Sequence, residues 1–258
     1  MRRIAATLGA LLFTAALAHA EEPEFVSSRP GATEGAIAVP AGYWQVETEI
    51  ASFARDRESG VKTKSWSGAA TTLRYGLAHG ADLELIVSPY VGQSVRDAGG
   101  KISDEGFGDV TLRARRTFAG QDGGAAFALI GYVTLPTAKD GLGAEKVEGG
   151  LIATGAVPLS SVDELAATLD LGAISENDSY AGDAFAAINW GHALSDRASV
   201  YLEATAERAA HDDETAATWG LGAAYLIGPA TQIDAGANFA LTDAADDASF
   251  FIGWAHRF

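Results

Sequence analysis

The stretch from Trp44 to Ile50 reads WQVETEI, and its side chains alternate between two kinds. Successive side chains of a β-strand point to opposite faces, so a period of two residues indicates a strand with one apolar and one polar face. The polar face carries two carboxylates within three residues. One face collects Trp44, Val46, Thr48 and Ile50, and the other collects Gln45, Glu47 and Glu49.

The same alternation recurs about a dozen times along the chain. Longer polar stretches and short turns connect the segments in turn, which is how up-and-down barrels of the bacterial outer membrane are built. The sequence therefore predicts an all-β protein, a transmembrane antiparallel up-and-down β-barrel of about 12 strands over residues 42–258. The longer stretches are Gln93 to Glu105, Thr137 to Glu145, Ser175 to Gly182 and Thr242 to Asp247, and the short turns are Gly76 to Ala81, Gly120 to Gly123, Leu159 to Val162, Ala193 to Asp196 and Gly228 to Ala230.

A soluble β-sandwich is the alternative, because alternation also describes sheets with one wet face. Three features favour the barrel: long segments, aromatic residues near segment ends, and charges at strand centres, which a dry core would not hold. The aromatic residues are Tyr43, Trp44, Tyr75, Phe118, Trp190 and Tyr225 toward the short turns and Phe53, Trp66, Trp219 and Phe250 toward the longer stretches. The central charges are Glu47, Glu49, Glu84, Arg113, Arg115, Glu203 and Asp234.

Composition excludes several classes of protein. The 258 residues include no Cys, so there is no disulfide framework, thiolate metal site or cysteine nucleophile. With 18 Lys and Arg against 34 Asp and Glu, the net charge of -16 argues against a nucleic-acid partner. No motif indicates a cofactor.

The N-terminus predicts export. Arg2 and Arg3 precede an apolar stretch from Ile4 to Leu17, and Ala18-His19-Ala20 resembles a cleavage site, so residues 1–20 are interpreted as a signal peptide. The next segment, residues 21–41, is too rich in Pro and Gly to form a strand. We expect it at the periplasmic mouth of the barrel.

The C-terminus resembles the signal that outer-membrane barrels present to the barrel assembly machinery. Phe258 ends the chain, with Trp254 and Ile252 at alternating positions before it, although His256 stands where an aromatic residue is usual.

Several pieces further upstream resemble the outer-membrane transporters of the "MetA-pathway of phenol degradation" family. The resemblance implies a channel-like outer-membrane protein for aromatic or other hydrophobic nutrients and identifies no substrate. The pieces are Arg29 to Glu34, Val39 to Glu47, Leu73 to Ala78, Gly106 to Val110, Thr134 to Thr137 and Gly253 to Phe258.

The interior charges suggest how such a channel would select solutes. We expect the Arg side chains of the first four strands to face the Glu side chains across the lumen as a polarised constriction. The alternative is that these pairs only brace the barrel wall. The candidates are Arg74, Arg113 and Arg115 facing Glu47, Glu49 and Glu84, with Glu203 and Asp234 elsewhere in the lumen.

The N-terminal segment offers a second hypothesis. It tucks into the lumen as a partial plug with Arg29 paired to an interior carboxylate, or it remains a periplasmic tail.

Catalytic and metal-site interpretations find little support. The His residues share no metal-binding spacing, and no Ser and His are visibly paired, so we expect neither an enzyme nor a metal site. The acidic runs His211 to Glu214 and Asp243 to Asp247 either bind divalent cations that bridge lipopolysaccharide or are solvated loop tips.

Three functions remain open. They are a channel for passive uptake of small solutes, a closed structural barrel, and a barrel enzyme. The expected partners are outer-membrane lipid, lipopolysaccharide, the barrel assembly machinery and small-molecule solutes.

Overall fold

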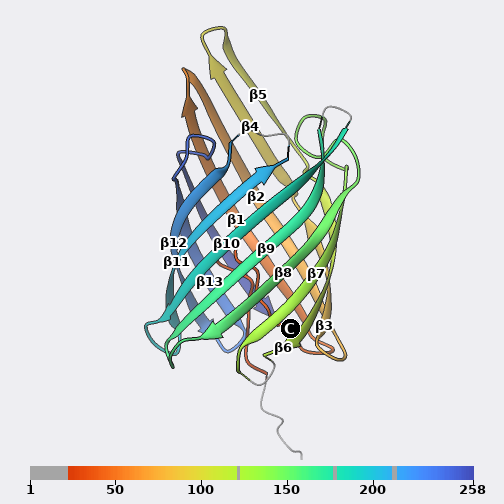
Figure 1. Ribbon diagram of the computed structural model, residues 1–258, viewed down its shortest axis with the longest axis vertical. Helices are drawn as coiled ribbons and strands as arrows, with labels where there is room; N and C mark the ends of the chain where they lie inside the picture. The colour runs from red at the N-terminus through yellow and green to blue at the C-terminus, as the bar shows by residue number, and fades with distance from the viewer. Residues whose placement is uncertain (1–22, 121–122, 177–178, 211–213) are drawn as a thin grey trace, which may run out of the picture.

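The fold is a closed antiparallel β-barrel (Figure 1). The computed structural model describes residues 23–120, 123–176, 179–210 and 214–258, so the predicted signal peptide lies outside the described residues. The strands are β1 (Trp44–Glu58), β2 (Val61–Leu77), β3 (Ala81–Val87), β4 (Tyr90–Asp97), β5 (Gly100–Gly106), β6 (Val110–Ala119), β7 (Ala126–Leu135), β8 (Glu148–Pro158), β9 (Asp163–Glu176), β10 (Ser179–Ala193), β11 (Ala198–Ala209), β12 (Ala216–Gly228), β13 (Thr231–Ala240) and β14 (Ala248–Arg257).

The prediction of a 12-stranded barrel is confirmed. β1 pairs with both β2 and β14, which closes the sheet. Two of the 12 spans are each divided into two strands. In the first, β3 and β4 both pair with β2 and are separated by Ser88-Pro89. In the second, β5 pairs with β4 and β6 pairs with β3. Proline cannot donate a ladder hydrogen bond, which accounts for the first break. In the part of the chain that the structure describes, no helix is long and apolar enough to cross a membrane.

One predicted loop is itself a hairpin. The stretch Gln93 to Glu105 was expected to be a long polar connection, but most of it belongs to β4 and β5, which project beyond the neighbouring strands (Figure 1). The turn is closed by Asp97, whose Oδ1 accepts hydrogen bonds from the amides of Gly99 and Gly100 at 2.7 and 3.1 Å. Polarity along this stretch marks an exposed strand pair rather than a loop.

The two faces of the wall follow the predicted alternation. In β1, Gln45 and Glu47 are buried, whereas Trp44 and Ile50 are exposed on the outside. A bulge at Ile50 shifts the register against β14, and beyond it Phe53 lies opposite Phe250, both exposed. Apolar side chains cover the outside of the barrel, so its polar residues line the interior, the reverse of a water-soluble fold.

Candidate functional site in the barrel lumen

Residues 23–40 run through the inside of the barrel and contain no strand (Figure 1). They run from the short-turn end into the lumen and back, and side chains of nearly every neighbouring strand bond to their backbone. A buried backbone without regular structure needs such partners, because an unpaired polar group away from water is costly. The lumen wall therefore supplies the hydrogen bonds that a strand or helix would otherwise make.

The segment is first held by β1, β13 and β14. Arg257 donates to the carbonyl of Glu24 at 2.7 Å, and Gln45 donates to that of Val26 at 2.9 Å. Arg29 then makes two hydrogen bonds to Asp234, of 2.8 and 3.2 Å, and its guanidinium lies over the ring of Phe251. Paired bonds of this kind fix both position and orientation.

Gly253 on β14 makes room for Arg29. A Cβ added at this glycine would lie 2.0 Å from Nη2 of Arg29, inside any allowed contact. A second close approach occurs where the segment leaves the lumen: a Cβ at Gly76 would lie 2.0 Å from the carbonyl oxygen of Pro40. The absence of side chains at these two positions permits the segment to lie against the wall.

The middle of the segment is bound by β8, β9 and β11. The carboxylate of Glu203 accepts hydrogen bonds from the amides of Ala32 and Thr33, each at 2.9 Å, and from the Thr33 hydroxyl at 2.7 Å. On the next strands, Thr168 accepts from the amide of Glu34 at 3.0 Å and Thr154 donates to its carbonyl at 2.5 Å. One carboxylate thus satisfies three donors of the segment.

The returning part is bound by β2, β3 and β6. Thr117 donates to the carbonyl of Ala36 at 2.8 Å and accepts from the amide of Ala38 at 2.9 Å. Asp82 accepts from the amide of Val39 at 2.9 Å. Together with the contacts above, these bonds form a nearly complete circuit around the bore.

A buried ion cluster joins the first strands of the wall. Arg74 on β2 lies 2.9 Å from Glu47, 2.7 Å from Asp82 and 3.6 Å from Glu84, while Arg115 lies 2.9 Å from Glu84. All five side chains are at most 5% exposed. Strand register produces this cluster, because Arg74 is directly opposite Glu84 and Arg115 directly opposite Asp82.

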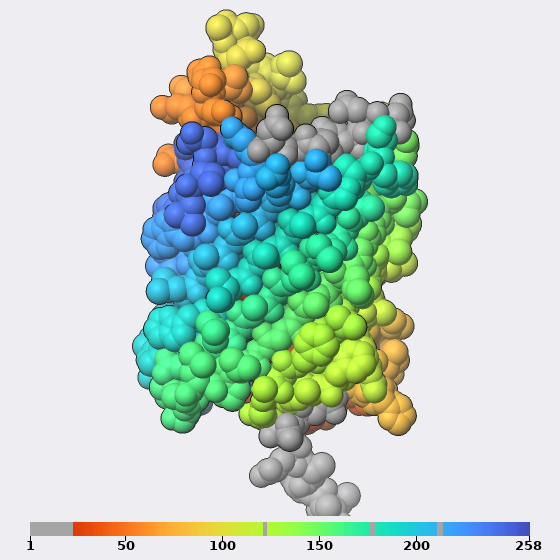
Figure 2. Space-filling view, in the orientation of Figure 1, coloured from red at the N-terminus to blue at the C-terminus, as the bar shows by residue number. Residues whose placement is uncertain are grey.

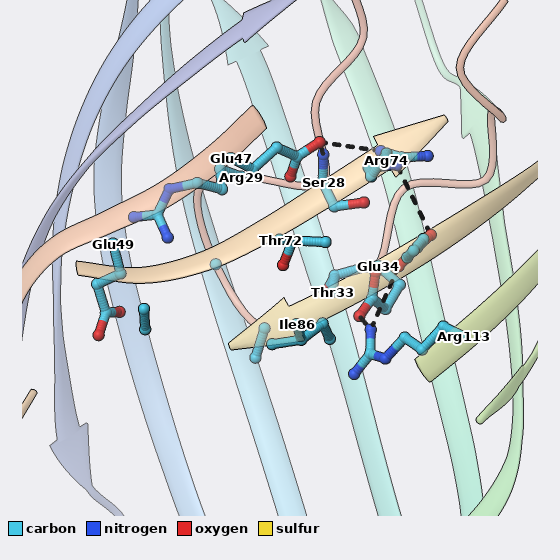
Figure 3. Close-up of a pocket in the computed structure, with 14 residues that line it drawn as sticks. Ser28, Arg29, Thr33, Glu34, Glu47, Glu49, Thr72, Arg74, Ile86 and Arg113 are labelled. Carbon is cyan, nitrogen blue, oxygen red and sulfur yellow. Dashed lines mark hydrogen bonds and ion pairs between the residues drawn. The ribbon is translucent and has the colours of Figure 1, made fainter. Parts of the chain in front are cut away.

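The cluster differs from the arrangement expected from sequence. The Arg and Glu side chains pair between neighbouring strands rather than facing one another across the lumen. Arg113 is partly exposed and pairs with Glu34 of the N-terminal segment (Figure 3). Glu34 also lies 3.1 Å from Arg115. Glu49 accepts a hydrogen bond from Ser67 at 2.8 Å and, among the described residues, forms no ion pair. Glu203 and Asp234 lie in the lumen too, bound to the segment as described above.

Several lumen residues were not among the sequence candidates. Asp82 is a member of the ion cluster, Glu34 pairs with Arg113 and Arg115, and Thr117, Thr154 and Thr168 bind the segment. The strand residues share one signal. Each lies at an inward position of its strand, an even number of residues away from another inward polar residue. Asp82, for example, is two residues from Glu84. No comparable signal was available for Glu34, because its segment has no period.

Two cavities lie on opposite sides of the segment. One of about 280 Å³ lies toward the long-loop end and is lined by Glu49, Thr72 and Ile86 of the wall (Figure 3). The other, about 720 Å³, lies at the short-turn end and is lined by Leu77, Pro158 and other residues of that rim. Ser28, Arg29, Thr33 and Glu34 line both cavities, so the segment forms the layer between them.

The described residues hold no group of three or more His, Asp or Glu side chains arranged for a metal ion. His192 contacts Asp163 at 2.8 Å and His256 contacts Thr231 at 2.7 Å. Ser160 bonds to Asp163 rather than to a His, so these contacts form no Ser-His pair. Residues 211–213 of the first acidic run lie outside the described residues.

The predicted assembly signal occupies the outer face at the barrel seam. Ile252 is exposed, Phe258 is 65% exposed, and the amide of Phe258 donates to the carbonyl of Trp44 at 2.8 Å. Recognition of Ile252, Trp254 and Phe258 by the assembly machinery remains a prediction.

A family model described as "Putative MetA-pathway of phenol degradation" matches residues 27–258. An outer membrane channel from Pseudomonas putida F1 has a similar structure, with a TM-score of 0.64 and 17% identity over 89% of this chain and 99% of that one. The beta domain of the Bordetella autotransporter BrkA aligns with a TM-score of 0.56 and 16% identity, over 84% of this chain and 100% of that one. The NanC porin aligns with a TM-score of 0.55 and 8% identity, over 83% of this chain and 98% of that one. No curated protein sequence matches the chain. At these identities the structural likenesses show the fold, that of outer-membrane barrels.

Proposed function

The chain belongs to the family described as "Putative MetA-pathway of phenol degradation", and from that premise we propose that it is an outer-membrane channel for passive uptake of small solutes. The observation that carries the proposal is the pair of cavities separated by a single layer of chain. In this proposal residues 23–41 act as a partial plug, anchored by Arg29 on Asp234. Displacing that one layer would join the two cavities into a path.

The proposed solutes are small aromatic or hydrophobic molecules. The family description, with its reference to phenol degradation, supports this class. A similar structure is described as an outer membrane channel and another as a porin, which supports transport in general. In the lumen, Arg113 lies over the ring of Tyr132 and Arg29 over that of Phe251, so aromatic rings as well as charges face the bore.

A closed structural barrel is the second candidate. The observation that favours it is the hydrogen bonding of the segment, whose backbone is bound by wall side chains around most of the bore. A barrel enzyme has less support, because the similar structures include a channel and a porin and the described His residues form no Ser-His pair.

The channel proposal is tested by swelling of proteoliposomes. With the protein refolded into vesicles, we expect entry of small aromatic solutes such as phenol derivatives and little entry of sugars of similar mass, because the path is narrow. Vesicles without protein, and vesicles with heat-denatured protein, provide the baselines. If no solute in a series varied in size, charge and hydrophobicity enters faster than baseline, the structural barrel is the better description.

We further propose that the charge of Arg113 influences the ion selectivity of the channel, and this role is tested by charge reversal. The Arg113 side chain is 21% exposed and lines the cavity on the long-loop side. Arg115 is buried in the ion cluster, so its substitution would also destabilise the wall. We expect Arg113→Glu to shift the reversal potential toward cation selectivity, since it adds negative charge to the bore. Arg116→Glu is the matched control, because Arg116 is exposed on the opposite face of the same strand. Equal reversal potentials in the two variants would leave Arg113 only a bracing role.

A further inference from the structure

Six cations gather on one face of the two hairpins β1–β2 and β4–β5. Strand register places Arg57 directly opposite Lys62, Lys62 opposite Arg96, and Arg96 opposite Lys101. These four side chains form a row across four adjacent strands. A second pair, Arg55 opposite Lys64, lies one step closer to the barrel. We name these six residues the cation array; they are 6 of the 18 Lys and Arg residues in a chain with net charge -16.

The array faces outward, away from the lumen. Phe53 lies opposite Phe250, and both are exposed on the outer surface, so Arg55 and Arg57 share that face by the alternation of β1. Lys64 lies over the ring of Phe53 at 6.0 Å. Figure 2 shows the β1–β2 tip (orange) and the β4–β5 hairpin (yellow) rising above the rest of the barrel.

The position of the array relative to the membrane follows from the aromatic residues below it. Phe53, Phe250 and Trp219 are exposed on the outer face toward the long-loop end, where aromatic side chains mark the membrane interface. Arg55 and Arg57 are two and four residues beyond Phe53. At about 3.3 Å per residue along a strand tilted by about 40°, Arg55 and Arg57 lie roughly 5 and 10 Å above Phe53, at the level of the lipid headgroups.

The array has no internal charge partner. Like charges directly opposite each other in a sheet are destabilising, and this row contains three such contacts in succession. Across the part of the chain that the structure describes, none of the six forms an ion pair with a carboxylate. Register and alternation place Asp56 and Asp104 on the other face of the same strands. One carboxylate, Glu105, shares the face of the array closer to the barrel, where it accepts a hydrogen bond from the Tyr90 hydroxyl at 2.7 Å. The six cations themselves therefore form an outward surface that an external anion would stabilise.

The chemistry of the array fits phosphate. Arg and Lys bind phosphate oxygens through charge-assisted hydrogen bonds, and neighbouring strands lie about 4.8 Å apart, so the row of four spans about 14 Å. Because the array starts where the aromatic interface ends, its ligand must be anchored in the outer leaflet. We propose that the cation array binds the phosphate groups of lipopolysaccharide directly, without a bridging divalent cation. This site differs from the acidic loop runs considered above, which would need such a cation.

The test compares lipid A binding by the full refolded protein and two double variants. Lys62→Gln with Arg96→Gln removes the centre of the row, and Arg116→Gln with Arg197→Gln removes two exposed cations from the short-turn end as the matched control. Bisphosphorylated, monophosphorylated and dephosphorylated lipid A are titrated in detergent and bound lipid is counted by native mass spectrometry, with and without EDTA. Inorganic pyrophosphate is added in a separate arm to distinguish a free anion from a lipid.

We expect bisphosphorylated lipid A to bind in the presence of EDTA, the array variant to bind it at least about tenfold more weakly, and the control to bind as the unmodified protein does. Affinity should fall with each phosphate removed, and pyrophosphate should compete only weakly. Equal binding by the two double variants would overturn the proposal, as would complete loss of binding in EDTA, which would assign the lipid to cation-bridged acidic loops. Barrel folding of each variant is checked by heat-dependent gel mobility, so that a loss of binding is not a loss of fold.

Discussion

Deleting Glu21 to Thr33 is expected to raise single-channel conductance severalfold. The deletion removes Arg29, Ala32 and Thr33, which hold the segment on Asp234 and Glu203. It also removes part of the layer between the two cavities. The channel should become more cation-selective as well, because the carboxylates of Asp234 and Glu203 lose their partners and face water. The measurement is conductance and reversal potential in a planar bilayer, with residues 21–258 and 34–258 each refolded without the predicted signal peptide.

Two point variants separate displacement of the segment from its loss. Arg29→Ala removes the anchor on Asp234 but keeps the chain, so we expect transient openings to the conductance of the deletion rather than a permanent increase. Arg197→Ala, in an exposed turn at the same end, should leave the trace unchanged. If the deletion conducts no better than the full chain, residues 23–41 are not a plug and the bore is limited elsewhere.

The barrel wall was predictable because it has a period. Two-residue alternation in stretches such as Trp44 to Ile50 defines strands, faces and the inward position of each charge. Register was not predictable, and register decides the partners: Arg74 meets Glu84 because the two are directly opposite on β2 and β3. Hence the sequence identified most members of the ion cluster but could not decide between pairs that face one another across the lumen and pairs that brace the wall.

The path of the N-terminal segment was beyond such reasoning. Residues 23–43 have no period, and their conformation is set by side chains more than a hundred residues away, such as Thr168 and Glu203. The hypothesis that Arg29 meets an interior carboxylate rested on charge alone, since an Arg in a polar lumen needs a partner. The hairpin from Gln93 to Glu105 was missed for a different reason: a strand pair that projects beyond the barrel wall lacks the long apolar face by which strands are found.

Arg74→Met is expected to destabilise the barrel by about 3 to 5 kcal/mol, the usual cost of removing one partner from a buried ion group. Arg74 is 1% exposed and contacts Glu47, Asp82 and Glu84, so its loss leaves three buried carboxylates with less compensation. The measurement is urea unfolding in lipid vesicles at neutral pH, followed by heat-dependent gel mobility. Arg116→Met, on the outer face of β6, should change stability by no more than about 0.5 kcal/mol.

A second substitution distinguishes charge from packing. If uncompensated charge is the cause, adding Asp82→Asn to Arg74→Met should recover part of the lost stability, because one buried carboxylate disappears while an amide oxygen can still accept from Val39. If lost packing is the cause, the double variant should be no more stable than the single one. Arg74 also donates to the carbonyl of Ile37 at 3.2 Å, so the same residue joins the wall to the N-terminal segment. If the wall depends on Arg74 for stability, the lumen should open by detachment of the segment at its Arg29 end. The end near Ile37 should then stay bound to Arg74.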